Sequence, residues 1–348
     1  MTNPDIRDLT RQELAGALIA LGEKGTRADR LYTCLYRKGA ADFAALDGIP
    51  RELSEKLAAR YSLRPLPAAE KLISKTDGTI KLLFRFPDGA PAESVVLFNK
   101  KTVSACISSQ SGCACGCTFC ATGALGFRRD LKPSEIVAQL AACRRAAGKL
   151  DSVVFMGMGE PFLNWANVKK SILILSDNKG CNFPQTKITV STVGVVPVIR
   201  ELAGSHLEIK LAISLITAGE KRAELAPMDK KYPLKDVIEA ARYYCTKTGK
   251  AVFFEYILFD GVNDGAQDAA KLLELIKGVP CKLNLILYNP LPGGTALPPG
   301  RVEKAKEFQK LIMAGGLRAH LRREKGTDIS AACGQLAAAA QGGSGPAL

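Results

Sequence analysis

The chain has 348 residues, of which 47% are hydrophobic and 24% charged, and this composition is that of an ordinary globular protein. Such a length can bury one large core and a smaller appended domain, and no apolar run approaches the length of a membrane span. The formal net charge of +14 favours a polyanionic partner, because each phosphate contact releases counterions, although charge alone fits a soluble basic protein equally well.

The polar start MTNPDIRDLT is unlike a signal peptide, so we expect a cytoplasmic protein. In a reducing cytosol, the odd number of 11 cysteines indicates metal or redox chemistry rather than a disulfide framework. The two histidines, His206 and His320, are expected to be packing or surface residues. Histidine-based zinc sites and histidine general bases are therefore disfavoured, and cysteines and carboxylates must carry any catalysis.

Residues 1–63 are predicted to form a small helical domain. Thr10 and Glu13 fit a capping box that opens a helix, and two further amphipathic stretches cover 26–39 and 50–61. Residues 64–103 are predicted to form a β extension of two hairpins. The first hairpin turns at Asp77-Gly78, which is the strongest short-range hairpin signal, and the second turns at residues 99–101.

Strand-like and helix-like segments alternate through residues 104–336. The predicted strands cover 152–156, 187–192, 207–215, 251–258, 282–287 and 317–322, and the predicted helices cover 133–148, 233–249, 266–278 and 301–316. This rhythm predicts an α/β fold with a parallel sheet, either open or closed into a barrel, and its chemistry at the carboxyl ends of the strands. The tail, 337–348, is predicted to be disordered because it has little to bury.

The stretch SGCACGCTFCATG places Cys113, Cys117 and Cys120 in a C-x3-C-x2-C pattern. Three thiolates are one short of the four that complete a structural zinc site or an electron-transfer cluster. One iron of a [4Fe–4S] cluster would then stay open to a ligand from outside the protein. The alternative is a zinc knuckle completed by Cys115 or a distant cysteine, which the absence of a second C-x2-C pair in the sequence disfavours.

Seven motifs spread over residues 93–336 carry a resemblance to a known family. They are ACISSQSGCACGCTFCATGALGF, VVFMGMGEPFLN, ITVSTVGVVP, KKYP, GVND, LNLILYNP and GTDISAACGQL, in this order. The set resembles the radical SAM RNA methyltransferases of the RlmN/Cfr family, which use S-adenosylmethionine (SAM), and the helical start is also similar to that family. The sequence departs from the family pattern at Ile216 and Asp229, where the family usually has His and Asn.

The resemblance implies a fold and a set of site residues. The fold would be a partial TIM-type (β/α) barrel over 104–336, with residues 1–63 as an RNA-binding accessory domain. Cys113, Cys117 and Cys120 would hold a [4Fe–4S] cluster, Cys333 would carry a methyl group, Cys106 would be the resolving thiol, and Glu93 would accept a proton. The residues that line SAM would be Gly159, Glu160, Ser191, Ser214, Leu215, Ile216 and Asn289, with the Glu160 carboxylate accepting from the SAM ammonium group.

The resemblance further implies methylation of adenine C2 in 23S rRNA and in tRNA by a monomer with a flavodoxin-like electron donor. One SAM would methylate Cys333, and a radical derived from a second SAM would activate that methyl group. Carbon transfer would join protein and RNA covalently until Cys106 forms a disulfide bond with Cys333. Two alternatives stay open, a C8 methyltransferase of the Cfr type and a non-catalytic iron–sulfur RNA-binding protein.

Several basic residues are candidates for an RNA-binding surface. If these basic residues converge on the face formed by the strand ends, they would contact RNA phosphates there. Each of them alone is typical of a solvated surface. They are Arg128, Arg129, Lys132, Lys230, Lys231, Arg322, Arg323 and Lys325.

Overall fold

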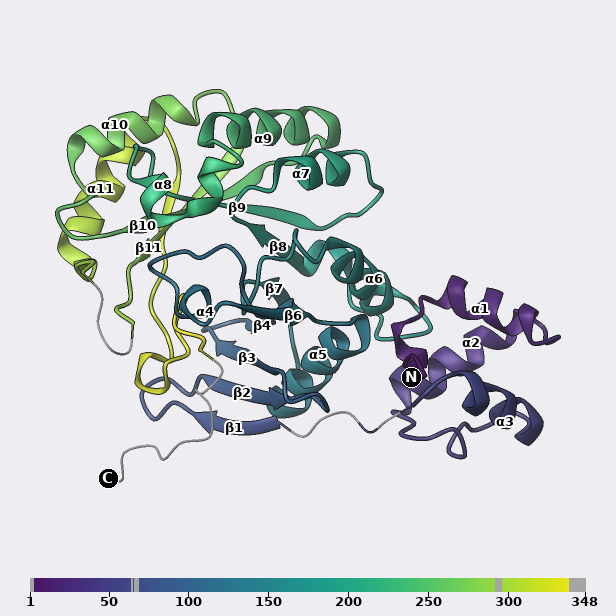
Figure 1. The fold of residues 1–348 in the computed structure, drawn as a ribbon. Helices are drawn as coiled ribbons and strands as arrows, with labels where there is room; N and C mark the ends of the chain where they lie inside the picture. The colour runs from purple at the N-terminus through teal and green to yellow at the C-terminus, as the bar shows by residue number, and fades with distance from the viewer. Residues whose placement is uncertain (1–2, 64, 66–68, 292–295, 338–348) are drawn as a thin grey trace.

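The structure, a computed structural model, describes residues 3–63, 65, 69–291 and 296–337. The tail predicted to be disordered therefore lies outside the described residues, except for Ala337. A ten-stranded sheet forms the body of the molecule, with the strand order β1-β2-β3-β4-β7-β8-β9-β10-β11-β12. Helices pack on the outer side of this curved sheet, and the N-terminal helices project from one side (Figure 1).

The N-terminal unit contains α1 (Arg11–Ala20), α2 (Arg27–Tyr32) and α3 (Arg51–Arg60), and the predicted capping box at Thr10 and Glu13 is confirmed. The predicted amphipathic stretch 26–39 is helical from Arg27 to Arg37, because α2 continues directly into the π-helical turn Thr33–Arg37. Several polar contacts fix the unit against the barrel, two of them near the start of the chain. The backbone N–H of Ser134 donates to Asp8 at 2.9 Å, and Arg11 pairs with Asp177 at 2.8 Å.

Both predicted hairpins are confirmed. Strands β1 (Ala69–Ile73), β2 (Ile80–Arg85), β3 (Pro91–Phe98) and β4 (Val103–Cys106) form an antiparallel meander. The residues expected as a β extension thus continue the same sheet as the barrel strands, because β4 also pairs in parallel with β7 (Ser152–Phe155). In this register Val95 of β3 lies opposite Cys106 of β4.

The parallel part of the sheet confirms the predicted partial barrel. After β7 it runs through β8 (Ile188–Thr192), β9 (Lys210–Ile216), β10 (Val252–Leu258), β11 (Cys281–Leu287) and β12 (Ala319–Leu321). The connecting helices are α5 (Pro133–Ala147), α6 (Trp165–Ser176), α7 (Val196–Ala203), α9 (Leu234–Thr248), α10 (Ala266–Leu275) and α11 (Val302–Ala314). Within the described residues β1 and β12 do not pair with each other, so the barrel is open.

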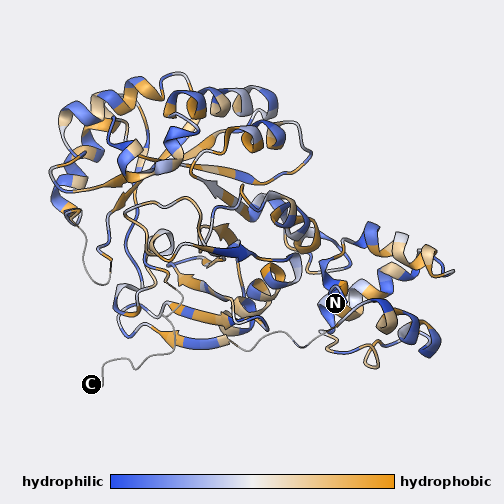
Figure 2. Ribbon diagram, viewed as in Figure 1, coloured by the Kyte–Doolittle hydropathy of each residue, from blue (hydrophilic) through white to orange (hydrophobic). Residues whose placement is uncertain are grey.

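The strands of the large sheet are mostly hydrophobic, and the helices place their polar faces outward (Figure 2). A second, two-stranded sheet pairs β5 (Gln110–Gly112) with the hydrophilic β6 (Phe127–Asp130) and brackets the cysteine-rich segment. In the part of the chain that the structure describes, no helix is both long and apolar enough to cross a membrane.

Candidate active site

The carboxyl ends of the parallel strands converge on a cavity of about 180 Å³. The cysteine-rich segment supplies one wall, and residues in or directly after the carboxyl-terminal halves of β7, β8, β9, β10 and β11 supply the others. Among the site residues predicted from the sequence, this cavity is lined by Cys113, Cys117, Cys120, Gly159, Glu160, Ser191, Ser214, Ile216, Asn289 and Cys333. Leu215 does not line it. Its side chain is fully buried in the main core instead.

The cysteine loop is held at both ends by backbone contacts. At its start, Gly112 has φ +77, and a Cβ there would lie 1.9 Å from the carbonyl oxygen of Gly126, so only glycine fits this crossing. In its middle, the N–H of Thr118 donates to the carbonyl of Leu225 at 3.0 Å. At its end, the N–H of Ala121 donates to Gly334 at 2.7 Å. This last contact ties the cysteine loop to the segment that carries Cys333.

Glu160 is anchored at the centre of the cavity wall. Its Oε2 accepts from the N–H of Val193 at 2.8 Å, and its Oε1 accepts from the N–H of Phe162 at 2.9 Å. Burial raises the pKa of this carboxyl to about 7, although the two backbone donors oppose the shift. A cationic group inside the cavity would favour its ionised form. The neighbouring Gly159 is required for packing, because a Cβ at its φ of +97 would lie 2.5 Å from Gln110 Cβ.

Ile216 is a strained residue in this wall. Its φ of +69 lies in the left-handed region, which β-branched side chains avoid, and its side chain is fully buried. The sheet register shifts at this point between β9 and β10. The departure from the family pattern noted at this position therefore falls where the backbone of the cavity wall is strained.

Sequence reasoning missed Arg222, which lies at the start of the short helix α8 (Arg222–Leu225) beneath the cavity. Its guanidinium donates to the carbonyls at the ends of β8 and β9 and pairs with Asp229. An arginine among other charged residues in a connecting segment is typical of a solvated surface, so nothing local in the sequence indicated its burial.

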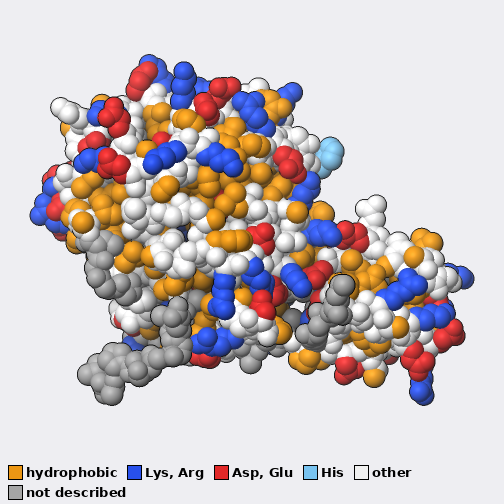
Figure 3. All heavy atoms as spheres, viewed as in Figure 1, with side chains coloured by type: hydrophobic (Ala, Val, Ile, Leu, Met, Phe, Trp, Pro, Cys, Tyr) orange, Lys and Arg blue, Asp and Glu red, His pale blue; other side chains and the backbone are white. Residues whose placement is uncertain are grey.

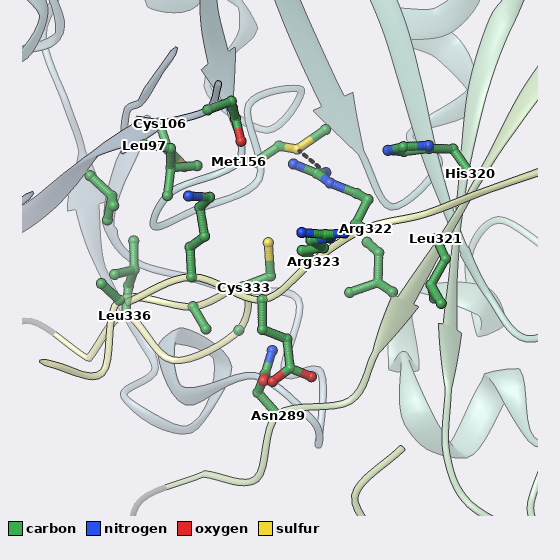
Figure 4. A pocket seen from close by; sticks show the side chains of 18 of the residues that line it. Leu97, Cys106, Met156, Asn289, His320, Leu321, Arg322, Arg323, Cys333 and Leu336 are labelled. Carbon is green, nitrogen blue, oxygen red and sulfur yellow. Dashed lines mark hydrogen bonds between the residues drawn. The ribbon is translucent and has the colours of Figure 1, made fainter. Parts of the chain in front are cut away.

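A second cavity, of about 760 Å³, adjoins the first and contains Cys106 and Cys333. Cys106 ends β4 and is buried, whereas Cys333 is exposed on the segment after β12. Figure 4 shows the sulfur of Cys333 pointing into the middle of this cavity. All 11 cysteines are free, so the predicted Cys106–Cys333 disulfide is not formed in this structure. Five residues line both cavities, namely Met156, Ile286, Asn289, Cys333 and Gly334, and Cys333 is the only thiol among them.

Arg322 brings positive charge to the two thiols. Its guanidinium lies 3.6 Å from the carboxylate of Glu255. It also lies 3.8 Å from the sulfur of Met156 (Figure 4). Burial and the nearby Cys333 raise the pKa of Cys106 to about 12, while Arg322 opposes that shift. Cys106 is therefore a protonated thiol near neutral pH.

Glu93 lies next to this region but lines neither cavity. Its side chain is fully buried, pairs with Lys81 at 3.2 Å, and accepts from the N–H of Ala337 at 3.0 Å. Lys81 also donates to the carbonyl of Ser330. The structure therefore brings Glu93 to the segment that carries Cys333, but the backbone of that segment covers its carboxylate.

The candidate RNA-binding cations differ in their surroundings. Arg322, Arg323 and Lys325 line the cavity that contains Cys333, as the sequence analysis anticipated for a strand-end face. Arg129, by contrast, is paired with Asp88 and Glu135, which neutralise its charge. On the face drawn in Figure 3, basic side chains gather around β6 and α5, beside the N-terminal helices.

Comparison with known proteins identifies the family to which this chain belongs. Residues 107–275 match the radical SAM superfamily, and residues 4–63 match the ribosomal RNA large subunit methyltransferase N-terminal domain. The dual-specificity RNA methyltransferase RlmN of Anaeromyxobacter dehalogenans is 42% identical over 98% of this chain and 93% of its own length. The chain belongs to the RlmN family of radical SAM RNA methyltransferases.

Further relatives agree with this assignment. The probable dual-specificity RNA methyltransferase RlmN of Thermotoga neapolitana is 40% identical over 95% of this chain and 97% of its own length. The crystal structure of a radical SAM methyltransferase from Sphaerobacter thermophilus superposes with a TM-score of 0.88 at 41% identity. That superposition covers 96% of this chain and 99% of the other.

Membership of the radical SAM superfamily implies a [4Fe–4S] cluster and SAM, and the residues present fit both. Cys113, Cys117 and Cys120 face one cavity, and the pKa of Cys117 is raised by burial and then by the neighbouring thiolates of Cys120 and Cys113. A raised pKa disfavours the free thiolate, so these sulfurs need a positive partner such as iron to be held as thiolates. Among the described residues, no group of three or more His, Cys, Asp or Glu side chains is placed to hold a single metal ion.

Proposed function

We propose that this protein transfers a methyl group to C2 of a specific adenine in 23S rRNA and in tRNA. The observation that carries the proposal is the position of Cys333, which lines both the cysteine-loop cavity and the cavity that contains Cys106. A carrier of a methyl group must be activated on one side and release its carbon on the other. The names of the relatives, dual-specificity RNA methyltransferases, support RNA of two kinds as the substrate.

Cys113, Cys117 and Cys120 hold the cluster in this proposal, and SAM lies against Gly159, Glu160, Ser191, Ser214, Ile216 and Asn289. Leu215 does not face SAM, but its backbone helps to fix the wall of the SAM site. Its carbonyl accepts hydrogen bonds from Arg222 and from the N–H of Thr217. The bound pair supplies a methyl group and a hydrogen-abstracting radical. Glu160 orients the ammonium group of SAM with an ionised carboxylate, which its backbone donors already favour.

The two thiols and one carboxylate perform the covalent steps. Cys333 Sγ takes the methyl group and, once that group is activated, is joined through its carbon to the adenine ring. Glu93, which pairs with Lys81, would accept the ring proton once the segment that covers its carboxylate moves aside. Cys106 Sγ then attacks Cys333 Sγ, so that an S–S bond forms while the bond between sulfur and the transferred carbon breaks. The electron pair of that bond stays on carbon, which takes a proton and becomes the product methyl group.

The cellular setting follows from the substrates. A flavodoxin-like donor supplies the electrons that start each turnover, and the reductant also restores the two thiols after the disulfide has formed. Ribosomal and transfer RNA place the enzyme in the cytoplasm. We propose that a monomer acts, because both cavities are built from one chain.

The proposal is tested by nucleoside analysis of unmodified 23S rRNA and tRNA after incubation with the reduced, SAM-loaded enzyme. We expect 2-methyladenosine in both RNAs. A product containing 8-methyladenosine would identify a Cfr-type enzyme instead, because the two nucleosides are separable by mass spectrometry with chromatography. Binding of RNA without any methylated adenosine would favour the non-catalytic alternative.

A further inference from the structure

A groove separates the N-terminal helices from the barrel and has a volume of about 1120 Å³. One side is the segment after α2, the other side is the carboxyl end of α5, and the floor includes the loop that precedes β8. Six cationic side chains line it against one carboxylate, that of Asp151. The cations of this basic groove are Arg7, Arg37, Lys38, Arg144, Arg145 and Lys187.

Three of these six cations form ion pairs or hydrogen bonds with neighbouring protein groups, and the other three form no ion pair. Arg7 pairs with Asp5, Lys38 pairs with Asp47, and Arg37 donates to the carbonyl of Gly180 across the groove. The remaining three, Arg144, Arg145 and Lys187, are exposed and form no ion pair within the described residues. The single carboxylate is already engaged, because Asp151 accepts from the N–H of Val103 at 2.7 Å.

Helix electrostatics account for only part of this arrangement. Arg144 and Arg145 lie in the last turn of α5, where cations are favoured by the helix dipole. That preference does not explain Lys187, which comes from a different connection and faces the same groove. Unpaired cations from two elements around one groove are instead the arrangement that binds a polyanion with regularly spaced charges.

The basic groove lies at the opposite end of the strands from the active site. Asp151 precedes β7 and Lys187 precedes β8, whereas Met156 and Ser191, at the other ends of these strands, line the catalytic cavities. Met156 lies five residues after Asp151 along an extended chain, which corresponds to about 17 Å at ~3.3 Å per residue. A ligand in the basic groove is therefore not in contact with the adenine that is methylated.

We infer that the basic groove binds the phosphodiester backbone of substrate RNA at a segment distant from the target adenine. This inference rests on the proposed function. The contacts are sequence-independent, because the unpaired groups are Arg and Lys side chains that meet phosphates in either kind of RNA. The basic groove thus holds the body of the RNA, while the strand-end cavities select the base.

The test compares two variants that each lose three positive charges. The first carries Arg144→Gln, Arg145→Gln and Lys187→Gln, and the control carries Lys271→Gln, Lys306→Gln and Lys310→Gln. The control lysines are exposed on α10 and α11. Affinity is measured against salt for an unmodified tRNA, for 23S rRNA, and for a short stem–loop that contains the target adenine. Equal melting temperatures show that all proteins are folded.

We expect the groove variant to bind full-length RNA about tenfold more weakly, with the slope of log K against log salt reduced by about two. The control should bind like the wild type, and the stem–loop should bind all three proteins alike. If the groove variant loses affinity for only one of the two long RNAs, that RNA is the one whose phosphates occupy the basic groove. Equal affinity of the groove variant and the control for both long RNAs would overturn the inference, as would equal loss with the stem–loop.

Failure of this inference is distinguishable from failure of the proposed function. Methylated adenosine formed by the wild type, together with unchanged RNA affinity in the groove variant, removes only the role of the basic groove. Absence of methylated adenosine in the wild type removes the proposed function, whatever the salt dependence shows.

Discussion

Arg222 and Asp229 form an ion pair directly beneath the strand ends that line the cysteine-loop cavity. The guanidinium is only 1% exposed, and besides Asp229 it donates to Leu215 O at 2.9 Å and to Val193 O at 2.6 Å. Leu215 lies at the end of β9, and Val193 directly follows β8. Arg222 therefore joins two neighbouring strand ends, and Asp229 balances its charge.

Removal of Arg222 should destabilise the fold strongly. Arg222→Met would leave Asp229 without its cation and the carbonyl of Val193 without its arginine donor, so we expect a loss of about 3–5 kcal/mol in the free energy of unfolding. Asp229→Asn should lose only about 1–2 kcal/mol, because an amide oxygen still accepts and the carbonyls still solvate the guanidinium. Urea unfolding of the two variants measures both values, and equal losses would contradict this account.

The crossing of β5 and β6 should make Gly112 essential for the cluster. Gly112 and Gly78 both have positive φ, +77 and +74, but only at Gly112 would a Cβ meet backbone, at 1.9 Å from Gly126 O. Gly78→Ala should therefore cost only about 1–2 kcal/mol of backbone strain. Gly112→Ala should also displace the loop and lower the iron content of the reconstituted protein. Full iron content in Gly112→Ala would show that the crossing does not position the cysteines.

Iron content should also separate the four cysteines of the loop. Alanine at Cys113, Cys117 or Cys120 removes a ligand, so each variant should lose the brown colour of the anaerobically reconstituted protein. Cys115→Ala should keep it, because the family pattern does not use this position as a ligand. Iron and sulfide analysis measures the difference. Loss of the cluster in Cys115→Ala alone would reverse the ligand assignment.

The sequence predicted the elements whose signals are local. Asp77-Gly78 marked a hairpin, the capping box marked the start of α1, and alternating apolar segments marked most parallel strands. The helices α6 and α7 were not predicted. Nor were β5 and β6, because β5 has three residues and β6 is mostly polar, so neither shows an apolar alternation.

Within the candidate site, the motif residues were found but their three-dimensional partners were not. Arg129 was read as an RNA-binding cation, yet it meets Asp88, 41 residues away in the sequence. Arg222 was not singled out, because the carbonyls that bury it come together only when β8 and β9 pair. Such long-range contacts leave no periodic signal in the sequence.

The two thiols of the proposed reaction should differ in reactivity. Burial raises the pKa of Cys106 to about 12, and Cys333 is exposed. Because the thiolate is the reactive form, alkylation of Cys106 in the folded protein should be slow near about pH 8 and should rise about tenfold per pH unit below its pKa. Cys333 should be alkylated first, as measured by peptide mass spectrometry. Arg322→Gln should slow Cys106 further, because it removes a cation that lowers that pKa.

Substitution of the two thiols should stop the proposed reaction at different stages. Cys333→Ala should keep the cluster, because Cys333 is not one of the three loop thiols, but it has no sulfur that can accept a methyl group. It should therefore yield neither methylated RNA nor a covalent complex. Cys106→Ala should accept the methyl group on Cys333 and attack the adenine, and then stall for want of a thiol that can cleave the carbon–sulfur bond.

The stalled product of Cys106→Ala is a protein joined to RNA through Cys333. It should appear on a denaturing gel as a band of raised mass that nuclease treatment removes. Cys143→Ala is the matched control, because Cys143 is also a buried thiol but lies on α5 and lines neither catalytic cavity. It should release its product normally. The covalent route requires Cys106 to free the RNA and Cys333 to carry the methyl group. Normal turnover by Cys106→Ala, together with an unmethylated Cys333 peptide in the wild type, would therefore rule this route out.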